Sequence, residues 1–267
     1  MTDDKVDDMA EASTSGARAA PPPNAAPPRA EPPREDSTRA FVRNTVVMST
    51  GTALSRLTGF LRLSAMAFAL GITESRLPDA YNIANITPNI LYELALGGIL
   101  TSVVVPVVVE WMQTHGRDAA WDVVRRLFTI TLVVLSAIAV LGIVLAPWII
   151  DLYTVGYPPV QREAVHDLAT FFLRFFMPQV VFYGIGAVAA GLLNSHRRFA
   201  APMFAPIANN LIVIATFLVF AAMSGPPEGS HELVTGAQQL VLAVGTTLGV
   251  VAMTVALWPS VRATGFR

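Results

Sequence analysis

The sequence predicts an all-α polytopic membrane protein. Of its 267 residues, 53% are hydrophobic and 14% are charged, and the mean hydropathy is +0.53. A soluble domain carries about 25% charged residues, so this chain lacks the polar surface that water requires. Six long apolar runs reach the roughly 20 residues that a helix needs to cross a bilayer, and none shows the alternating pattern of a strand.

The first 38 residues differ from the rest of the chain. They carry eight acidic and four basic side chains, are rich in Pro and Ala, and have no apolar period that could offset the entropy of ordering them. We therefore expect a disordered cytoplasmic tail at residues 1–38 and a six-span membrane lobe at residues 39–267. We expect no signal peptide, because the tail opens with acidic residues and has no continuous apolar stretch. A proline-rich ligand for a partner domain is the alternative interpretation.

The membrane lobe is expected to contain six helices in succession. The third and sixth runs hold no charged residue, the second contains Pro88 and Pro106, and the fourth contains Pro178. Proline removes a helical hydrogen bond, so we expect a kinked or tilted second helix and a bend at Pro178. The six runs are residues 44–72, 80–109, 127–146, 168–193, 203–224 and 233–258.

Arginines in the joints between the runs predict how the chain crosses the membrane. If the tail is inside the cell, nine arginines lie in cytoplasmic segments and two, Arg76 and Arg162, lie in outer ones. Cytoplasmic loops carry the excess of basic residues, so both termini should be cytoplasmic, which agrees with an even number of spans. The nine are Arg39, Arg43, Arg117, Arg125, Arg126, Arg197, Arg198, Arg262 and Arg267.

Two arginines, Arg56 and Arg62, lie inside the first apolar run. At 100° per residue they fall within an arc of roughly 160° that also holds small and polar residues, opposite the large apolar ones. An arginine at membrane depth costs about 2.5–3.5 kcal/mol and normally faces a wet cavity or an interior partner. We interpret this face as anion-binding, because guanidinium holds phosphate through two hydrogen bonds; pairing with a carboxylate or carbonyl is the alternative. The small and polar residues are Ser49, Gly51, Thr52, Ser55 and Gly59.

Other charges occur in the second and fourth runs. Asp79 and Glu93 are candidates to balance the two arginines or to couple an ion. Arg174, flanked by phenylalanines early in the fourth run, reads as an interfacial or paired side chain.

Several function classes find no support in the sequence. It contains no cysteine, and its four histidines have no metal-ligand spacing. It also lacks a Gly-rich phosphate loop, a nucleophile with its base, and a basic-aromatic surface for nucleic acid. We therefore expect no enzyme, no cofactor, no metal and no nucleic-acid partner.

Three stretches carry recognisable motifs. "SRLTGFLR" (residues 55–62) is similar to a first-helix pattern SRxxGFxR, "DAYNIANITPNILYELALGGILTSVVVPV" (79–107) to a second-helix pattern DAF…PN…(F/V)VP, and "GLLNSHRRFAAPMFAPIANN" (191–210) to a joint LN…RF…P…AP…N. In this order and at this spacing they resemble the MurJ/MviN family of lipid II flippases, within the multidrug/oligosaccharidyl-lipid/polysaccharide exporter superfamily. The resemblance runs from about Thr45 to the C-terminus.

The resemblance implies a transporter of the bacterial plasma membrane that serves peptidoglycan synthesis and cell shape. Such a protein moves the undecaprenyl-pyrophosphate-linked cell-wall precursor from the inner to the outer leaflet by alternating access between two lobes. A cationic cavity is implied to receive the pyrophosphate, with Arg56, Arg62 and Asp79 at positions that match functional residues of the family. Glu93 is a further candidate in that cavity, and membrane lipids and cell-wall synthesis proteins are implied partners.

Two departures from the family pattern stand out. Tyr92 and Glu93 occupy positions where many members have an Arg-Arg pair, and Gly97 replaces a glutamate, so the charge set is either rearranged or weaker. The family has fourteen spans, which implies that this chain is an N-terminal lobe that acts with a missing C-terminal lobe or a second chain.

Two other functions are left open by the residues. The first is an exporter of another polyprenyl-linked saccharide or of a drug, which lipid identification by mass spectrometry distinguishes. The second is a non-transporting scaffold that recruits cell-wall synthesis proteins through the proline-rich tail, which depletion and measurement of precursor accumulation distinguishes.

Overall fold

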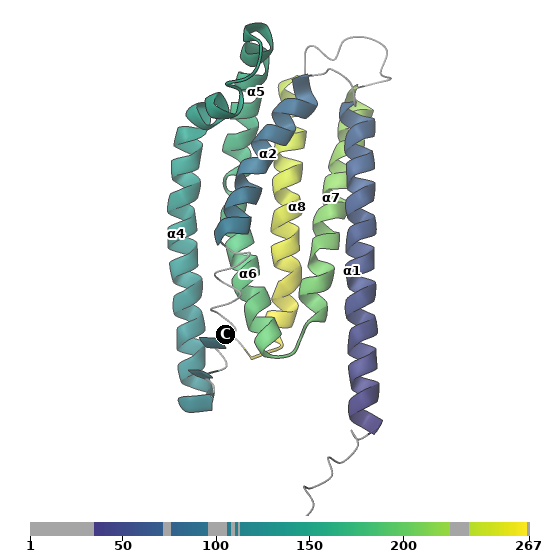
Figure 1. Cartoon of the computed structure of the whole chain (residues 1–267), viewed down its shortest axis with the longest axis vertical. Helices are drawn as coiled ribbons and strands as arrows, with labels where there is room; N and C mark the ends of the chain where they lie inside the picture. The colour runs from purple at the N-terminus through teal and green to yellow at the C-terminus, as the bar shows by residue number, and fades with distance from the viewer. Residues whose placement is uncertain are drawn as a thin grey trace, which may run out of the picture. The chain divides into compact units, whose positions relative to one another are not determined.

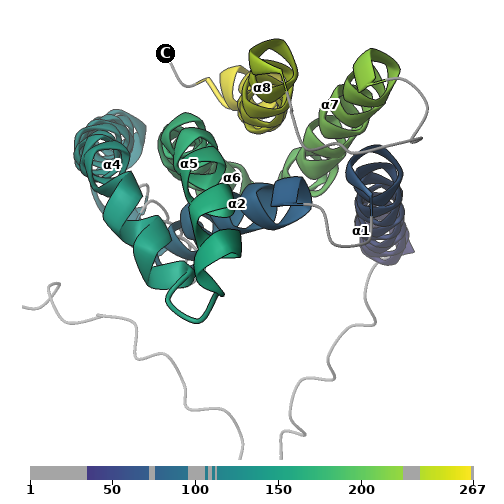
Figure 2. The same ribbon diagram turned by 90° about the horizontal axis from the view of Figure 1, so that it is seen from above.

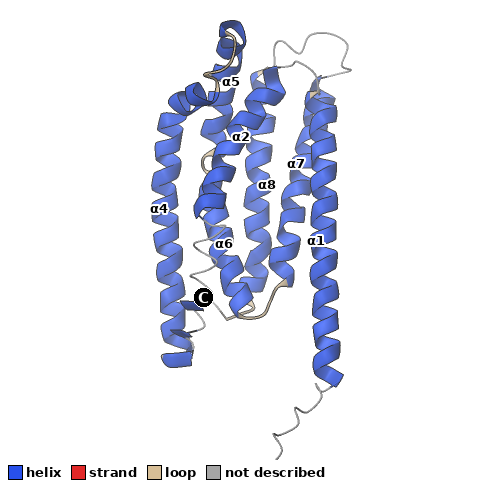
Figure 3. Ribbon diagram, in the orientation of Figure 1, coloured by secondary structure: helices blue, strands red, loops and turns tan. Residues whose placement is uncertain are grey.

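The computed structural model describes residues 35–71, 76–95, 106–107, 110–111, 113–224 and 235–265, and all regular secondary structure in these ranges is helical (Figure 3). The chain divides into a unit of residues 1–42 and a unit of residues 43–267, and the second is described below. The all-α class is therefore confirmed. Of the predicted tail, residues 1–34 lie outside the described residues, and the first helix already begins at Glu35.

Helices α1 (Glu35–Leu70) and α2 (Arg76–Ala95) come first along the chain. The segment Thr45–Leu70 of α1 is long and apolar enough to cross a membrane. The helix ends where Gly71 adopts a φ of +84°, and the Gly71 N–H still donates to the Ala67 carbonyl at 3.1 Å. Glycine takes this left-handed conformation without a steric penalty, which explains where α1 stops.

Five longer helices follow in the described part of the unit (Figure 1). Helix α4 runs opposite to the broken pair α5 and α6 that follows it, and α7 and α8 then run opposite to each other (Figure 1). Their bounds are α4 Gly116–Tyr153, α5 Pro159–Phe176, α6 Gln179–Ser195, α7 Ala200–Ser224 and α8 Gly236–Arg262.

Two of these helix ends show how local sequence sets the boundaries. Pro178 has no N–H to continue the helical ladder, so the last helical bond of α5 is donated by Met177 to the Leu173 carbonyl at 2.9 Å. The bend predicted at Pro178 is confirmed. Helix α8 starts with a capping box, in which the Thr235 side chain accepts from the Gln238 N–H and the Gln238 side chain accepts from the Thr235 N–H.

Five segments have the length and hydropathy of membrane spans, and they match five of the six predicted runs. The second run, 80–109, is described only in part: its beginning lies in α2, which is not among the five, and residues 96–105 lie outside the described residues. The predicted number of six spans is therefore confirmed only approximately. Helix α2 is not among the five segments because its polar side chains lower its hydropathy. The kink expected from Pro88 and Pro106 stays a prediction. The five segments are Thr45–Leu70, Trp121–Tyr153, Pro159–Ser195, Ala200–Met223 and Gly236–Arg262.

An aromatic cluster around Tyr81 joins four helices in the core. The Tyr81 ring meets Phe172 and Phe176 of α5 edge-on at centroid distances of 5.8 and 5.5 Å, and Phe217 of α7 at 5.6 Å. All four rings are buried. The Tyr81 hydroxyl shares a 2.8 Å hydrogen bond with the Thr246 hydroxyl of α8, so the polar atom of this buried ring is satisfied. The cluster fixes α2 against α5, α7 and α8.

Helices α7 and α8 approach each other closely at two glycines in the sequence GTTLG. A Cβ atom at Gly249 would lie 2.9 Å from Val213 Cγ2 and would also collide with the Asn209 side chain, and one at Gly245 would collide with Thr216. Small residues four apart allow this close approach inside a membrane, where van der Waals packing drives helix association.

Burial differs strongly among the spans. In the Pro159–Ser195 span 67% of the apolar window is buried, against 11% in Thr45–Leu70 of α1 and 22% in α4. The broken pair α5–α6 therefore forms the centre of the unit, while α1 and α4 lie at its margins with large apolar side chains exposed, among them Phe60, Phe68 and Leu152. Such surfaces are stable against lipid or against another protein surface.

Candidate functional site

Helix α1 docks on α7 through its small and polar side chains. A Cβ atom at Gly51 would lie 3.1 Å from Met203 Cβ, so only a small residue fits here. Asn210 Nδ2 donates to the Thr58 hydroxyl at 3.0 Å and to the Ser55 carbonyl at 3.3 Å. Part of the polar face that the sequence assigned to a ligand thus serves as a contact between helices, as small residues commonly do in membranes.

The two arginines of α1 leave this contact in different directions. Arg62 is half-buried and lies on the docking side of the helix, whereas Arg56 is exposed. Six residues of helix separate them by about 9 Å along the axis and about 120° around it. Neither guanidinium forms an ion pair or hydrogen bond with a residue that the structure describes. The alternative of a structural pair therefore has no support in the described part of the chain.

Helix α2 presents a polar stripe on the side opposite its buried core. Asp79, Asn82, Asn89 and Glu93 fall within an arc of about 80° at 100° per residue. Asn82 and Glu93 are exposed, while Asp79 and Asn89 are half-buried. The Asn89 carbonyl oxygen accepts a hydrogen bond from the Tyr183 hydroxyl at 3.2 Å. Asn82 and Asn89 were not among the site residues predicted from the sequence, although their spacing from Asp79 and Glu93 places all four on one face of a helix.

Asp79 lies beside the turn that joins α4 to α5. It borders an open hollow of about 240 Å³ together with Pro158 and Gln161. Burial raises the pKa of Tyr157 in this turn, and the Asp79 carboxylate raises it further because it would repel a tyrosinate. Asp79 and Glu93 lie fourteen residues apart, which is about 21 Å of helix, so both carboxylates cannot serve one arginine.

The four predicted site residues are therefore placed on two helices that follow each other along the chain, without direct bonds between them in the described residues. Figure 2 shows α1 and α2 on the same side of the α7–α8 pair. Arg62 lies within electrostatic reach of the Tyr81 hydroxyl on α2. Together the two helices present a polar stripe and two guanidinium groups that have no ion pair among the described residues. This arrangement suits an anionic ligand.

Arg174 lies farther from the start of its helical span than the sequence had indicated. The fourth span begins at Pro159, nine residues before the predicted start at Leu168, so Arg174 sits near the middle of Pro159–Ser195 and is exposed. It belongs to the last turn of α5, where a cation is favoured by the helix dipole. The interpretation of Arg174 as an interfacial or paired side chain stays a prediction, because the span is longer than the roughly 20 residues that cross a bilayer.

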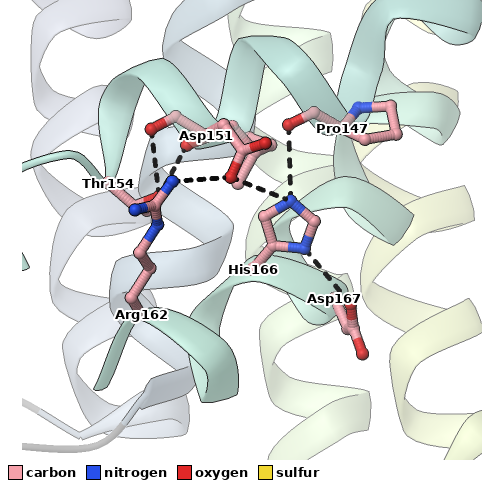
Figure 4. A network of polar contacts seen from close by, with 7 residues as sticks. Pro147, Asp151, Thr154, Arg162, His166 and Asp167 are labelled. Atoms are coloured by element: carbon pink, nitrogen blue, oxygen red, sulfur yellow. Dashed lines mark hydrogen bonds and ion pairs between the residues drawn. The ribbon is translucent and has the colours of Figure 1, made fainter. Parts of the chain in front are cut away.

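A polar network at the α4–α5 turn was also missed (Figure 4). Arg162 Nη2 donates to Asp151 Oδ1 at 2.9 Å, and His166 Nε2 lies 3.6 Å from the same oxygen and 3.3 Å from the Pro147 carbonyl. His166 Nδ1 lies 3.2 Å from Asp167 Oδ1. Because Asp151 and Arg162 are nearly half exposed, this pair contributes about 0–1 kcal/mol, and its main effect is to hold the two helix ends together.

Comparison with known proteins places the chain in context. The family model described as "Lipid II flippase MurJ" matches residues 66–267. The lipid II flippase MurJ of Burkholderia cenocepacia is 32% identical over 180 residues, which cover 67% of this chain and 34% of the relative. The probable lipid II flippase MurJ of Rhizobium meliloti is 30% identical over 187 residues, which cover 70% of this chain and 34% of the relative.

A solved structure agrees with this fold. The lipid II flippase MurJ in an inward closed conformation aligns with a TM-score of 0.63 at 21% sequence identity, covering 80% of this chain and 41% of that chain. The chain thus spans about a third of the length of these curated relatives. Since the family model matches most of its residues, the chain belongs to the MurJ family of lipid II flippases.

Proposed function

We propose that this chain forms the first lobe of a lipid II flippase, which moves the undecaprenyl-pyrophosphate-linked peptidoglycan precursor from the inner to the outer leaflet of the bacterial plasma membrane. The observation that carries the proposal is the family match over residues 66–267. It is supported by Arg56 and Arg62, which precede the match in the same spanning helix and have no ion pair among the described residues. Relatives that share a third of their length with this chain bear the name of that activity.

In this proposal Arg56 and Arg62 bind the pyrophosphate of the lipid. A pyrophosphate carries several negative oxygens, and guanidinium groups bind such oxygens through paired hydrogen bonds without losing their charge. The α2 stripe, with Asp79 at one end and Glu93 near the other, forms a polar wall for the hydrophilic head. Alternating-access transporters hold their substrate between two repeats, so this lobe supplies one wall and a C-terminal lobe or second chain supplies the other.

We further propose that both termini are cytoplasmic, as the arginine distribution suggests. Because the chain has no cysteine, single cysteines can be introduced without background. A cysteine at Gly156, in the α4–α5 turn, should react with an impermeant thiol reagent in intact cells. A cysteine at Ala263, at the end of α8, should react only after the membrane is opened. The reverse pattern would invert the orientation.

Complementation tests the transport proposal directly. Expressed alone, the chain should not sustain cells depleted of their flippase, while co-expression with the downstream spans of a family member should restore growth. In the restoring pair, Arg56→Ala and Arg62→Ala should each abolish growth, and Arg→Lys should restore it only partly, because lysine keeps the charge but not the paired hydrogen bonds.

The control is Arg126→Ala, which removes an exposed arginine near the start of α4. It should leave growth unchanged. Normal growth of both Arg56→Ala and Arg62→Ala at normal abundance would refute the anion-binding role. Failure of every pairing with downstream spans, together with copurification of other proteins but no lipid, would favour a scaffold.

A further inference from the structure

A second hollow, lined by two arginines, lies at the far end of the unit from Asp79, where α6 turns into α7. It measures about 300 Å³ and is bordered by Arg197 and Arg198 of the joint, by Val47 and Met48 of α1, and by Ser260 of α8. Among the described residues, no acidic side chain lines it. Measured from Met48, it lies about 12 Å along α1 from Arg56 and about 21 Å from Arg62, and neither of those arginines borders it.

The two arginines of this hollow have free donors. Both are exposed, and neither forms an ion pair within the described ranges. Other arginines of the chain behave differently, since Arg125 pairs with Asp122 at 3.6 Å and Arg162 pairs with an aspartate. An arginine pair without a carboxylate in reach creates a local excess of positive charge that attracts an anion.

The backbone holds this pair in a constrained conformation. Arg197 has a φ of +56°, which is left-handed and uncommon outside glycine. Its N–H donates to the Asn194 carbonyl at 3.0 Å, and the Arg198 N–H donates to the Leu193 carbonyl at 2.8 Å. These two bonds form a Schellman motif, whose left-handed position is usually glycine. The chain therefore places an arginine at a position where glycine would be more stable, and the motif fixes the direction in which both side chains leave the joint.

The walls of the hollow indicate the kind of anion. Val47 and Met48 provide an apolar side that continues into the exposed apolar surface of α1, where Val46 is 57% exposed. A soluble anion gains nothing from such a wall, whereas an acyl chain does. We propose that the hollow binds an anionic glycerophospholipid, with its phosphate on Arg197 and Arg198 and an acyl chain along Val47 and Met48.

The test measures lipid binding to the purified full chain. Native mass spectrometry should detect retained phosphatidylglycerol in preference to phosphatidylcholine, because only the former carries a net negative charge. The double variant Arg197→Gln/Arg198→Gln should lower the apparent affinity about tenfold or more, since it removes two charged phosphate donors. Ser260→Leu narrows the hollow without changing charge and should also weaken binding.

The matched control is Arg125→Gln/Arg126→Gln, which removes two arginines from the beginning of α4, outside the hollow. An equal loss of lipid in this control would show general electrostatic attraction and overturn the proposal. Full competition by millimolar inorganic phosphate would show a soluble-anion site and overturn the lipid assignment. If Arg197→Gln/Arg198→Gln does not fold, Arg197→Gly, which suits the left-handed backbone, provides the same comparison with one charge removed.

Discussion

Replacing Arg56 with leucine is expected to stabilise the isolated chain while abolishing the transport proposed for the assembled protein. Arg56 is exposed, lies within two residues of the middle of Thr45–Leu70, and has no partner among the described residues. On insertion scales arginine costs about 2.5–3.5 kcal/mol and leucine gains about 0.3–0.6 kcal/mol at the helix centre, a difference of about 3–4 kcal/mol. Snorkelling and local water reduce this difference, so we expect a gain of about 2 kcal/mol.

The assay is reversible unfolding of the purified chain in bilayer discs, monitored by the helical signal in circular dichroism. Arg125→Leu serves as the control, because Arg125 is exposed near the start of α4 beside Asp122; its stability should change by less than about 0.5 kcal/mol. Growth complementation with the downstream spans provides the functional readout. If Arg56→Leu lowered the free energy of unfolding by about 1 kcal/mol or more, Arg56 would form a structural hydrogen bond or ion pair. The anion-binding argument for this residue would then fail.

Two further predictions concern helix packing, and a third concerns the turn between α6 and α7. Gly249→Ala should be less stable than Gly59→Ala by about 1–3 kcal/mol in the same unfolding assay: both gain helix propensity, but only the first overpacks, since a Cβ at Gly59 would meet Asn210 Nδ2 at 3.7 Å. Equal stabilities would contradict the close α7–α8 contact. Asn210→Ala should lose about 1 kcal/mol and increase hydrogen exchange in α1, because two interhelical bonds are lost; unchanged exchange would argue against this docking. Arg197→Gly should raise the unfolding free energy by about 1 kcal/mol by relieving the left-handed strain, and a decrease would mean that the Arg197 side chain stabilises the joint.

Most of the helices could be predicted from the sequence because apolar runs of this length have few other stable states. The boundaries were less predictable where charged residues lie inside a helix. Helix α5 begins at Pro159, well before Leu168, since Arg162 and His166 are accommodated by Asp151 across the turn. A hydropathy profile ends the predicted span at such charged residues. Whether they are paired depends on the position of α4, which cannot be read from the local sequence.

The candidate site was predictable only as a list of residues. The angular position of Arg56 and Arg62 follows from helix geometry, but which polar residues contact a neighbour depends on α7. Asn210 lies 155 residues after Ser55 in the sequence and bonds to it. This contact is the reason that part of the polar face of α1 packs against α7. The left-handed Arg197 was equally hidden, because sequence patterns expect glycine or asparagine at that position.

The weak attachment of α1 bears on how a lobe of this kind would work. The arginine helix buries only 11% of its apolar window, against 67% in the α5–α6 pair. Its described contacts with α7 include the polar bonds of Asn210, the Thr52 hydroxyl 3.6 Å from Met203 Sδ and the close approach at Gly51, and at its end Ala65, Met66, Ala69 and Leu70 pack into the core. Since these contacts with α7 are few, the first part of this span can tilt against α7, while Ala69 and Leu70 hold its end in the core that contains Tyr81. Under the proposed function, the substrate-binding arginines would then sit on the least constrained spanning helix, while α2 and its polar stripe stay fixed. An anionic head that bound both helices would draw them together, so occupancy of the site and the arrangement of the lobe would be coupled through differential binding to the two positions of α1.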